Sequence, residues 1–249
     1  MEKNKKRARF LPLWIVLGFV LLLAVTVYWY LSDYYHAEPS ALSVIEQPAA
    51  GITVEKTADR IAFIPESYDT GMIFYPGAKV EFSAYAPMME RLSENGVLCV
   101  IVHMPGNMAV LDSNAADRVM NSFPEVSTWY IGGHSLGGAM AAGYALSHSD
   151  QLKGLVLLGA YSTKDLHGTD LRVLSVYGSE DQVLNHENYR KYRQNLPDNA
   201  VEQIIEGGCH AYFGNYGEQA GDGVPAIARE KQQEITVNLM IQMISGDKQ

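Results

Sequence analysis

The sequence predicts an α/β fold, in which a mostly parallel sheet of eight strands carries helices on both faces and is preceded by one transmembrane helix. Three observations lead to this prediction. Short β-rich runs alternate along the chain with segments patterned as helices, as they do in parallel sheets. Most of these runs are almost continuously apolar, which is typical of strands buried on both faces. A basic cluster and a long uncharged stretch precede them.

The first 31 residues combine a basic tail with an apolar segment. Lysine and arginine crowd the first ten positions, and residues 11–31 contain no charged residue. About 20 apolar residues cross a hydrocarbon core of about 30 Å, and Trp14 and Tyr28-Trp29-Tyr30 place aromatic rings near both ends. We therefore expect a cytoplasmic tail over 1–10, a single-pass membrane anchor over 11–31 and a domain outside the cytoplasm.

A cleavable signal peptide is the alternative interpretation of this segment. Its apolar region would be shorter, about 7–15 residues, and Tyr28-Trp29-Tyr30 is a poor setting for a small-residue cleavage signal. Residues 32–50 mix polar residues with Pro39 and Pro48, which favours a spacer. The folded domain is then expected over residues 51–249.

The predicted elements of this domain follow one another from Ile52 onward. The expected strands are Ile52–Glu55, Arg60–Ile64, Gly71–Tyr75, Val97–His103, Thr128–Gly132, Leu152–Gly159, Arg172–Tyr177 and Val201–Ile205. The expected helices are Ser83–Asn95, Ser113–Asn121, Leu136–Ser147, Asn185–Gln194 and Arg229–Ile244. The first helix carries apolar residues at three-to-four spacing and should lay that face on the sheet.

Charge and cysteine content exclude some classes of function. A formal net charge of -9 argues against nucleic-acid binding, which needs a positive face to displace counterions from phosphates. The two cysteines, Cys99 and Cys209, form no disulfide framework, and neither has metal-ligand spacing. We expect no metal and no cofactor.

The sequence Gly133-His134-Ser135-Leu136-Gly137 matches the pattern G-x-S-x-G. It follows a predicted strand and precedes a helix of small residues. This is the setting of a nucleophile elbow, a sharp, strained turn that exposes a serine. The helix N-terminus also offers an oriented N–H to a developing oxyanion. The pattern therefore predicts Ser135 as a nucleophile.

A serine hydroxyl is a weak nucleophile at neutral pH, so the chain should also supply a histidine base and an acid. In this fold the acid and then the histidine follow the serine along the chain. Asp181 and His210 each follow a predicted strand, at the carboxyl edge where sites gather in such sheets. Glu180 and Asp222 remain alternatives for the acid.

These residues resemble the serine branch of the α/β-hydrolase superfamily, in its small variants without a lid, over about residues 51–246. The resemblance implies that Ser135 attacks an ester-like carbonyl, that His210 is the general base and then acid, and that Asp181 holds the imidazole. It also implies an oxyanion hole made by the backbone N–H groups of Leu136 and Ala78. Here Tyr75-Pro76-Gly77-Ala78 replaces the frequent His-Gly of the family.

Three further residues are predicted near the pocket. Gly77 permits a tight turn beside Ala78, His103 ends a predicted strand at the same edge, and His134 occupies the variable position of the elbow and should pack beneath it. Only about ten residues, 162–171, stand where many relatives carry a lid. This shortness favours an open site and a small-molecule or surface-presented acyl substrate.

The sequence thus predicts a membrane-anchored, carboxylesterase-like serine hydrolase that cleaves an ester or related acyl bond through an acyl-enzyme. Two alternatives stay open: an acyltransferase that uses the same triad, and a membrane-tethered binding protein that keeps the fold without turnover. Neither the substrate nor the oligomeric state follows from the sequence.

Overall fold

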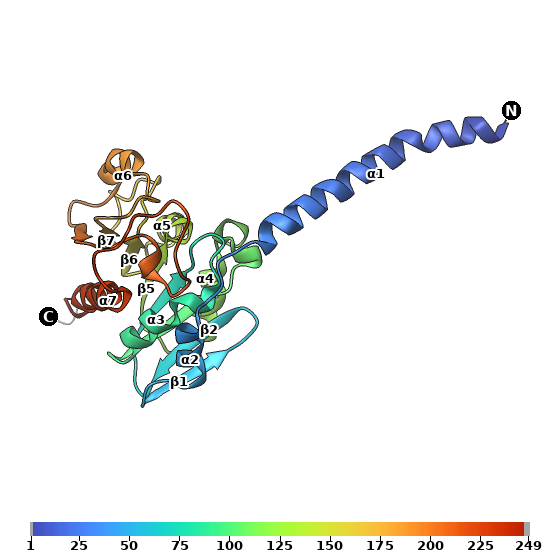
Figure 1. The fold of residues 1–249 in the computed structure, drawn as a ribbon. Coiled ribbons are helices and arrows are strands. Elements are labelled where there is room, and N and C mark those ends of the chain that lie inside the picture. The colour runs from blue at the N-terminus through green and yellow to red at the C-terminus, as the bar shows by residue number, and fades with distance from the viewer. Residues whose placement is uncertain (1, 247–249) are drawn as a thin grey trace. The chain divides into compact units, whose positions relative to one another are not determined.

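The computed structural model describes residues 2–246, with side chains from residue 15 onward. The chain divides into two compact units, residues 1–34 and 35–249. The first unit contains the long helix α1 (Glu2–Ser32), drawn in blue in Figure 1. Its part from Ile15 to Ser32 has a mean hydropathy of 2.2 and is long and apolar enough to cross a membrane, although a signal sequence would pass the same test. Side chains of the predicted basic tail, residues 1–10, lie outside the described part.

An eight-stranded sheet forms the centre of the second unit, which confirms the predicted fold class. The strand order is β1-β2-β4-β3-β5-β6-β7-β8. The β1–β2 and β2–β4 pairs are antiparallel, and every pair from β4–β3 to β7–β8 is parallel. The strands are β1 (Ile52–Lys56), β2 (Arg60–Pro65), β3 (Thr70–Tyr75), β4 (Val97–Val102), β5 (Thr128–His134), β6 (Gly154–Leu158), β7 (Arg172–Gly178) and β8 (Val201–Ile205).

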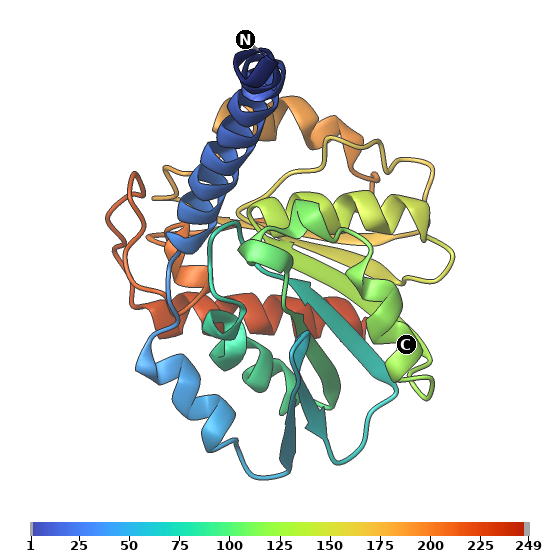
Figure 2. The same cartoon turned by 90° about the vertical axis from the view of Figure 1, so that its right-hand side faces the viewer.

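Helices cover both faces of this sheet, as Figure 2 shows. They are α2 (Pro39–Glu46), α3 (Ala86–Ser93), α4 (Ala115–Ser122), α5 (Leu136–Ser147), α6 (His186–Tyr192) and α7 (Arg229–Ser245). Short 3-10 turns occupy Phe82–Tyr85, Pro105–Asn107, Ala109–Leu111, Arg193–Asn195 and Ala211–Phe213.

The buried side chains form two cores, one on each face of the sheet. Strands β3, β4 and β6 are buried along their whole length, so alternate residues serve opposite cores. Phe74 packs in the core that contains α3 and α7, whereas Ile73 packs in the core that contains α4 and α5. The apolar face predicted for the helix at Ser83–Asn95 belongs to α3 and lies in the core that contains α3 and α7. Met88 and Leu92 are fully buried there.

The segment predicted as a spacer belongs to the folded unit, which begins at Tyr35 rather than near Gly51. Tyr35 pairs with Val80 in a parallel bridge, and its N–H donates to the Lys79 carbonyl over 2.7 Å. Helix α2 follows, with Pro39 in its first turn. Proline is tolerated there because the first N–H groups of a helix have no intrahelical acceptor. Pro39 therefore marks the start of a helix, whereas Pro48 follows the end of α2, and the segment predicted as a spacer is partly helical.

Candidate active site

Ser135 stands at a sharp turn between β5 and α5 with φ 53° and ψ -123°. Positive φ is strained for a residue with a side chain, and such strain persists only where the surroundings fix it. Here the Ser135 N–H donates to the Leu158 carbonyl over 2.9 Å, and the Ser135 carbonyl accepts from the Ala139 N–H over 3.1 Å. The turn has the geometry of the predicted elbow.

The two glycines of the motif are required by close backbone approaches. A Cβ on Gly133 would stand 2.6 Å from the carbonyl carbon of Gly137. A Cβ on Gly137 would collide with the Tyr75 carbonyl oxygen. The elbow thus packs directly on the loop after β3, which brings Ser135 next to the candidate oxyanion loop.

Asp181 and His210 meet across two loops that follow β7 and β8. The Asp181 Oδ2 to His210 Nδ1 distance is 2.8 Å, and the two residues are 2% and 1% exposed. The other carboxylate oxygen accepts the N–H groups of Val183 at 3.0 Å and Leu184 at 2.8 Å. These two hydrogen bonds hold the carboxylate in place, so it can orient the imidazole.

The second ring nitrogen of His210 is available for proton transfer. Nδ1 donates to the Asp181 carboxylate, so the neutral ring carries its lone pair on Nε2. Nε2 is buried and has no hydrogen-bond partner among the described residues. His210 and Ser135 line the same hollow. A buried polar atom without a partner is unusual in a folded protein, and this one belongs to a residue that lines the same hollow as Ser135.

Glu180 and Asp222, the two alternative acids, form hydrogen bonds with nearby loop residues. Glu180 accepts the Ser179 hydroxyl over 3.0 Å, and Asp222 accepts the Ala211 N–H over 2.8 Å. Of the three acidic candidates, only Asp181 contacts the His210 ring. Asp222 instead holds the loop that carries His210, a structural part that the sequence motif did not reveal.

His134 lies beneath the elbow and links it to the oxyanion loop. The Tyr85 hydroxyl accepts the Gly77 N–H over 3.0 Å and forms a second hydrogen bond, of 2.9 Å, with His134 Nδ1. The ring centroid of His134 stands 4.4 Å from that of His210. Burial, and then the nearby His210, hold the pKa of His134 well below its usual range, so His134 is neutral. No feature of the sequence placed Tyr85 in the candidate site, because a tyrosine on the apolar face of a helix is typical of a core residue.

Backbone hydrogen bonds single out the candidate donors of an oxyanion hole. In the loop after β3, the N–H of Gly77 donates to Tyr85, that of Lys79 to Asn107, and that of Val80 to Gly77. Ala78 is thus the residue of this stretch whose N–H has no acceptor among the described residues. Leu136 begins α5 directly after Ser135. Leu136 lines the hollow that contains Ser135, whereas Ala78 and Gly77 do not.

Two residues named from the sequence lie apart from this arrangement. His103 bonds the Ala58 carbonyl through Nδ1 at 2.8 Å and stacks on Phe82 at 4.5 Å, and it does not line the hollow that contains Ser135. Burial raises the pKa of the Cys209 thiol to about 12, so it remains protonated at neutral pH. Gln232 holds the Cys209 backbone by accepting its N–H at 3.0 Å and donating to its carbonyl at 2.8 Å.

The hollow beside Ser135 has a volume of about 360 Å³. It lies at the carboxyl ends of β5, β6 and β7, where sites form in parallel sheets. Its lining comprises Ser135, Leu136, Ala139, Met140, Gly159, Ala160, Tyr161, Thr163, Val183, Leu184, Asn185 and His210.

Comparison with a family model decides the classification. Residues 71–234 match the model described as the alpha/beta hydrolase family. The chain belongs to the α/β-hydrolase family. The matched range includes the elbow, Asp181 and His210, and membership of this family supports hydrolase activity.

Solved structures similar to this α/β hydrolase include enzymes with esterase and hydrolase names. Est1E from Butyrivibrio proteoclasticus is 16% identical with a TM-score of 0.57, over 79% of this chain and 100% of that one. Dienelactone hydrolase from Anabaena variabilis is 13% identical with a TM-score of 0.57, over 77% and 98%. MGS-MChE2, from the metagenome of lagoon sediments in Morocco, is 14% identical with a TM-score of 0.59, over 79% and 100%. At these identities the likeness concerns the fold. No curated protein matches the chain.

Proposed function

We propose that this α/β hydrolase is a membrane-anchored serine hydrolase that cleaves an ester bond through an acyl-enzyme on Ser135. The observation that carries the proposal is one juxtaposition. A serine with a strained left-handed backbone and an imidazole with an unpartnered, buried Nε2 line the same hollow, and Asp181 orients that imidazole.

The proposed reaction uses these groups in two steps. His210 Nε2 takes the Ser135 hydroxyl proton while Oγ bonds to the ester carbonyl carbon. The amides of Ala78 and Leu136 stabilise the oxyanion, the carbon–oxygen bond to the alcohol breaks, and His210 returns the proton to the departing alcohol. Water, deprotonated by the same His210, then attacks the acyl-enzyme; the bond from the acyl carbon to Ser135 Oγ breaks, His210 returns the proton to Oγ, and the acid is released.

Labelling by a fluorophosphonate probe tests this proposal directly. The full-length wild type in detergent should incorporate one probe, and Ser135→Ala should incorporate none. Ser147→Ala is the matched control, because Ser147 is exposed at the other end of the same helix, α5. A folded wild type that stays unlabelled, or equal labelling of the Ser135→Ala variant, contradicts the proposal. A competing alcohol added to the turnover assay distinguishes hydrolysis from acyl transfer by its products.

The apolar part of α1 and the basic residues before it support an uncleaved, single-pass anchor with a cytoplasmic N-terminus. The catalytic domain would then act outside the cytoplasm. Protease added to intact cells should digest the domain while a cytoplasmic marker stays intact. Protection of the domain until the cells are lysed would contradict this topology, and a mature chain that lacks α1 would contradict the anchor.

A further inference from the structure

We propose that the hollow beside Ser135 binds an uncharged aliphatic chain, so that the substrates are neutral esters of aliphatic acids or alcohols. This inference rests on the proposed serine hydrolase and deepens it to a substrate class. It starts from the character of the lining. The apolar side chains that line it include Leu136 and Met140 of α5, Val183 and Leu184 of the loop after β7, and Ala160.

The hollow offers no partner to a charged group. Among the described residues, no lysine, arginine, aspartate or glutamate lines it. Asp181 stands nearby but is 2% exposed, and both of its carboxylate oxygens are occupied by hydrogen bonds. A carboxylate or ammonium on the substrate would lose its water there without gaining an ion pair, which is strongly unfavourable.

Two polar groups of the lining form hydrogen bonds within the protein. The Asn185 side-chain oxygen caps α6 by accepting the Asn188 N–H over 2.8 Å. The Tyr161 hydroxyl accepts the Asn188 side-chain amide over 3.3 Å. Asn185 and Thr163 are exposed, so they border the solvent side of the hollow. Apart from these residues, Ser135 and His210, the lining consists of glycine and apolar side chains.

The position of the hollow implies that an aliphatic chain bound there is attached to the reacting carbonyl. Ser135 and His210 themselves line it, so any chain that fills it is attached to the carbonyl on the acyl or the alcohol side. Leu136, Met140 and Val183 are only half-buried, so a bound chain would remove them from water. Each methylene that becomes buried in this way should raise kcat/KM by about fourfold.

Two ester series, assayed with the full-length enzyme in nanodiscs, test the inference. One series lengthens the acyl chain from acetyl to hexanoyl on a constant leaving group, and the other lengthens the alcohol on a constant acetyl group. We expect kcat/KM to rise about fourfold per methylene in at least one series, and that series identifies the side that binds. The hemisuccinyl ester should react at least tenfold more slowly than the butanoyl ester of equal carbon number.

A charge placed in the lining provides the matched variant. Met140→Glu should lower kcat/KM for the preferred long ester by more than tenfold and flatten the chain-length profile. Leu146→Glu, on the same helix but outside the hollow, should keep the wild-type profile. The wild-type profile is itself decisive if Met140→Glu fails to fold.

The two possible failures are distinguishable. A wild type that is labelled at Ser135 but shows flat profiles in both series, or that prefers the hemisuccinyl ester, overturns this inference and leaves the serine hydrolase intact. A folded wild type that is neither labelled nor active on any ester overturns the proposed function and this inference with it.

Discussion

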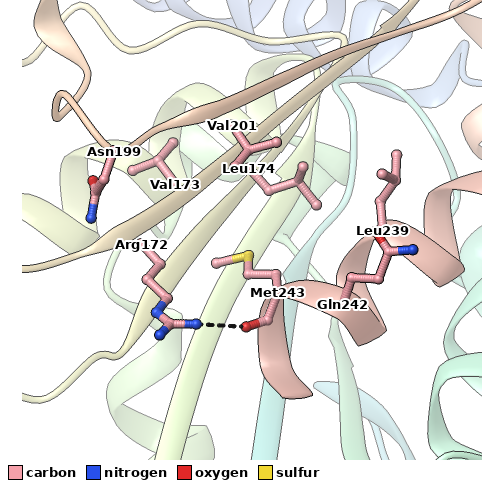
Figure 3. Close-up of a pocket in the computed structure, with 8 residues that line it drawn as sticks. All are labelled: Arg172, Val173, Leu174, Asn199, Val201, Leu239, Gln242 and Met243. Carbon is pink, nitrogen blue, oxygen red and sulfur yellow. Dashed lines mark hydrogen bonds between the residues drawn. The ribbon is translucent and has the colours of Figure 1, made fainter. Parts of the chain in front are cut away.

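Two hollows of similar size lie at opposite edges of the same sheet. The one beside Ser135, about 360 Å³, stands at the carboxyl ends of the strands. The other, about 410 Å³, lies where β7 and β8 begin, against the last turns of α7 (Figure 3). Its lining joins apolar side chains to Arg172, whose guanidinium donates to the Met243 and Gly246 carbonyls, each at 3.2 Å.

Local chemistry, and not size, separates these hollows. At the carboxyl edge the chain keeps a strained serine backbone and an imidazole nitrogen without a partner. At the amino edge the guanidinium of Arg172 is bonded to backbone carbonyls of α7 and Gly246, so it ties the C-terminal helix to β7. Strain and unsatisfied buried polar groups are costly, and they mark the edge where a reaction can use them.

The largest expected effect is on kcat, and it comes from comparing one substitution beside each hollow. Ser135→Ala should lower kcat by about 10⁶-fold, because a triad acts as a unit. Arg172→Gln should leave kcat unchanged and lower the melting temperature, since it removes two hydrogen bonds to carbonyls of the C-terminal segment. Ester turnover and thermal unfolding of both variants provide the check. A large loss of kcat in Arg172→Gln would break the contrast between the edges.

The acids within the carboxyl edge give the next largest effect. Asp181→Asn should lower kcat by about 10⁴-fold, because it removes the carboxylate that orients His210. Glu180→Gln and Asp222→Asn should each cost less than about tenfold, since neither carboxylate contacts the imidazole. Steady-state kinetics of the three variants rank them. If Asp222→Asn or Glu180→Gln lost more activity than Asp181→Asn, the acid would be reassigned.

Tyr85 tests how far the site extends beneath the elbow. Tyr85→Phe should lower kcat by about tenfold at unchanged KM, because the Gly77 N–H and His134 Nδ1 lose their shared hydroxyl partner. Tyr75→Phe is the matched control: its hydroxyl bonds Ser113 and Ala116 in the core on the opposite face. Both variants should lose about 1–3 kcal/mol of unfolding free energy. Equal kcat values for the two variants would reduce Tyr85 to a packing role.

The smallest effect is the pH dependence that His134 contributes to stability. Its pKa is lowered in the folded protein, so below about pH 6.5 the unfolded chain binds a proton that the folded protein does not. The free energy of unfolding should therefore fall as pH decreases below about 6.5, by up to about 1.4 kcal/mol per pH unit from this residue. His134→Gln should remove that share of the slope in denaturant titrations at several pH values. An identical slope in the variant would show that His134 is protonated in the folded state.

Local patterns predicted most of the fold and the centre of the site. All eight strands appear where β-rich runs predicted them, and the elbow is a contiguous strand, turn and helix around Ser135. Such features depend on neighbours in the sequence, which is why a single chain reveals them. Helix α2 was missed because Pro39 and Pro48 were interpreted as breaking the chain, whereas Pro39 starts a helix.

Features that depend on distant contacts could not be predicted in this way. Tyr85 and His134 are 49 positions apart, and nothing local links them. His103 was expected near the pocket because it follows a strand at the correct edge. However, β3 lies between β4 and β5 in the sheet, so His103 follows a strand that is not adjacent to the elbow. The sequence favoured Asp181 over Glu180 and Asp222, but the contact with His210 that distinguishes Asp181 joins residues that are distant in the chain.

Direct detection of the covalent intermediate tests the central claim most sharply. The full-length enzyme is mixed with p-nitrophenyl butanoate, quenched in acid during turnover, digested and analysed by mass spectrometry. The account predicts a butanoyl group on the Ser135 hydroxyl in the wild type and none on that peptide in Ser135→Ala. Turnover with the butanoyl group on another residue, or with no acyl-enzyme formed under conditions where deacylation is slowed, would contradict it.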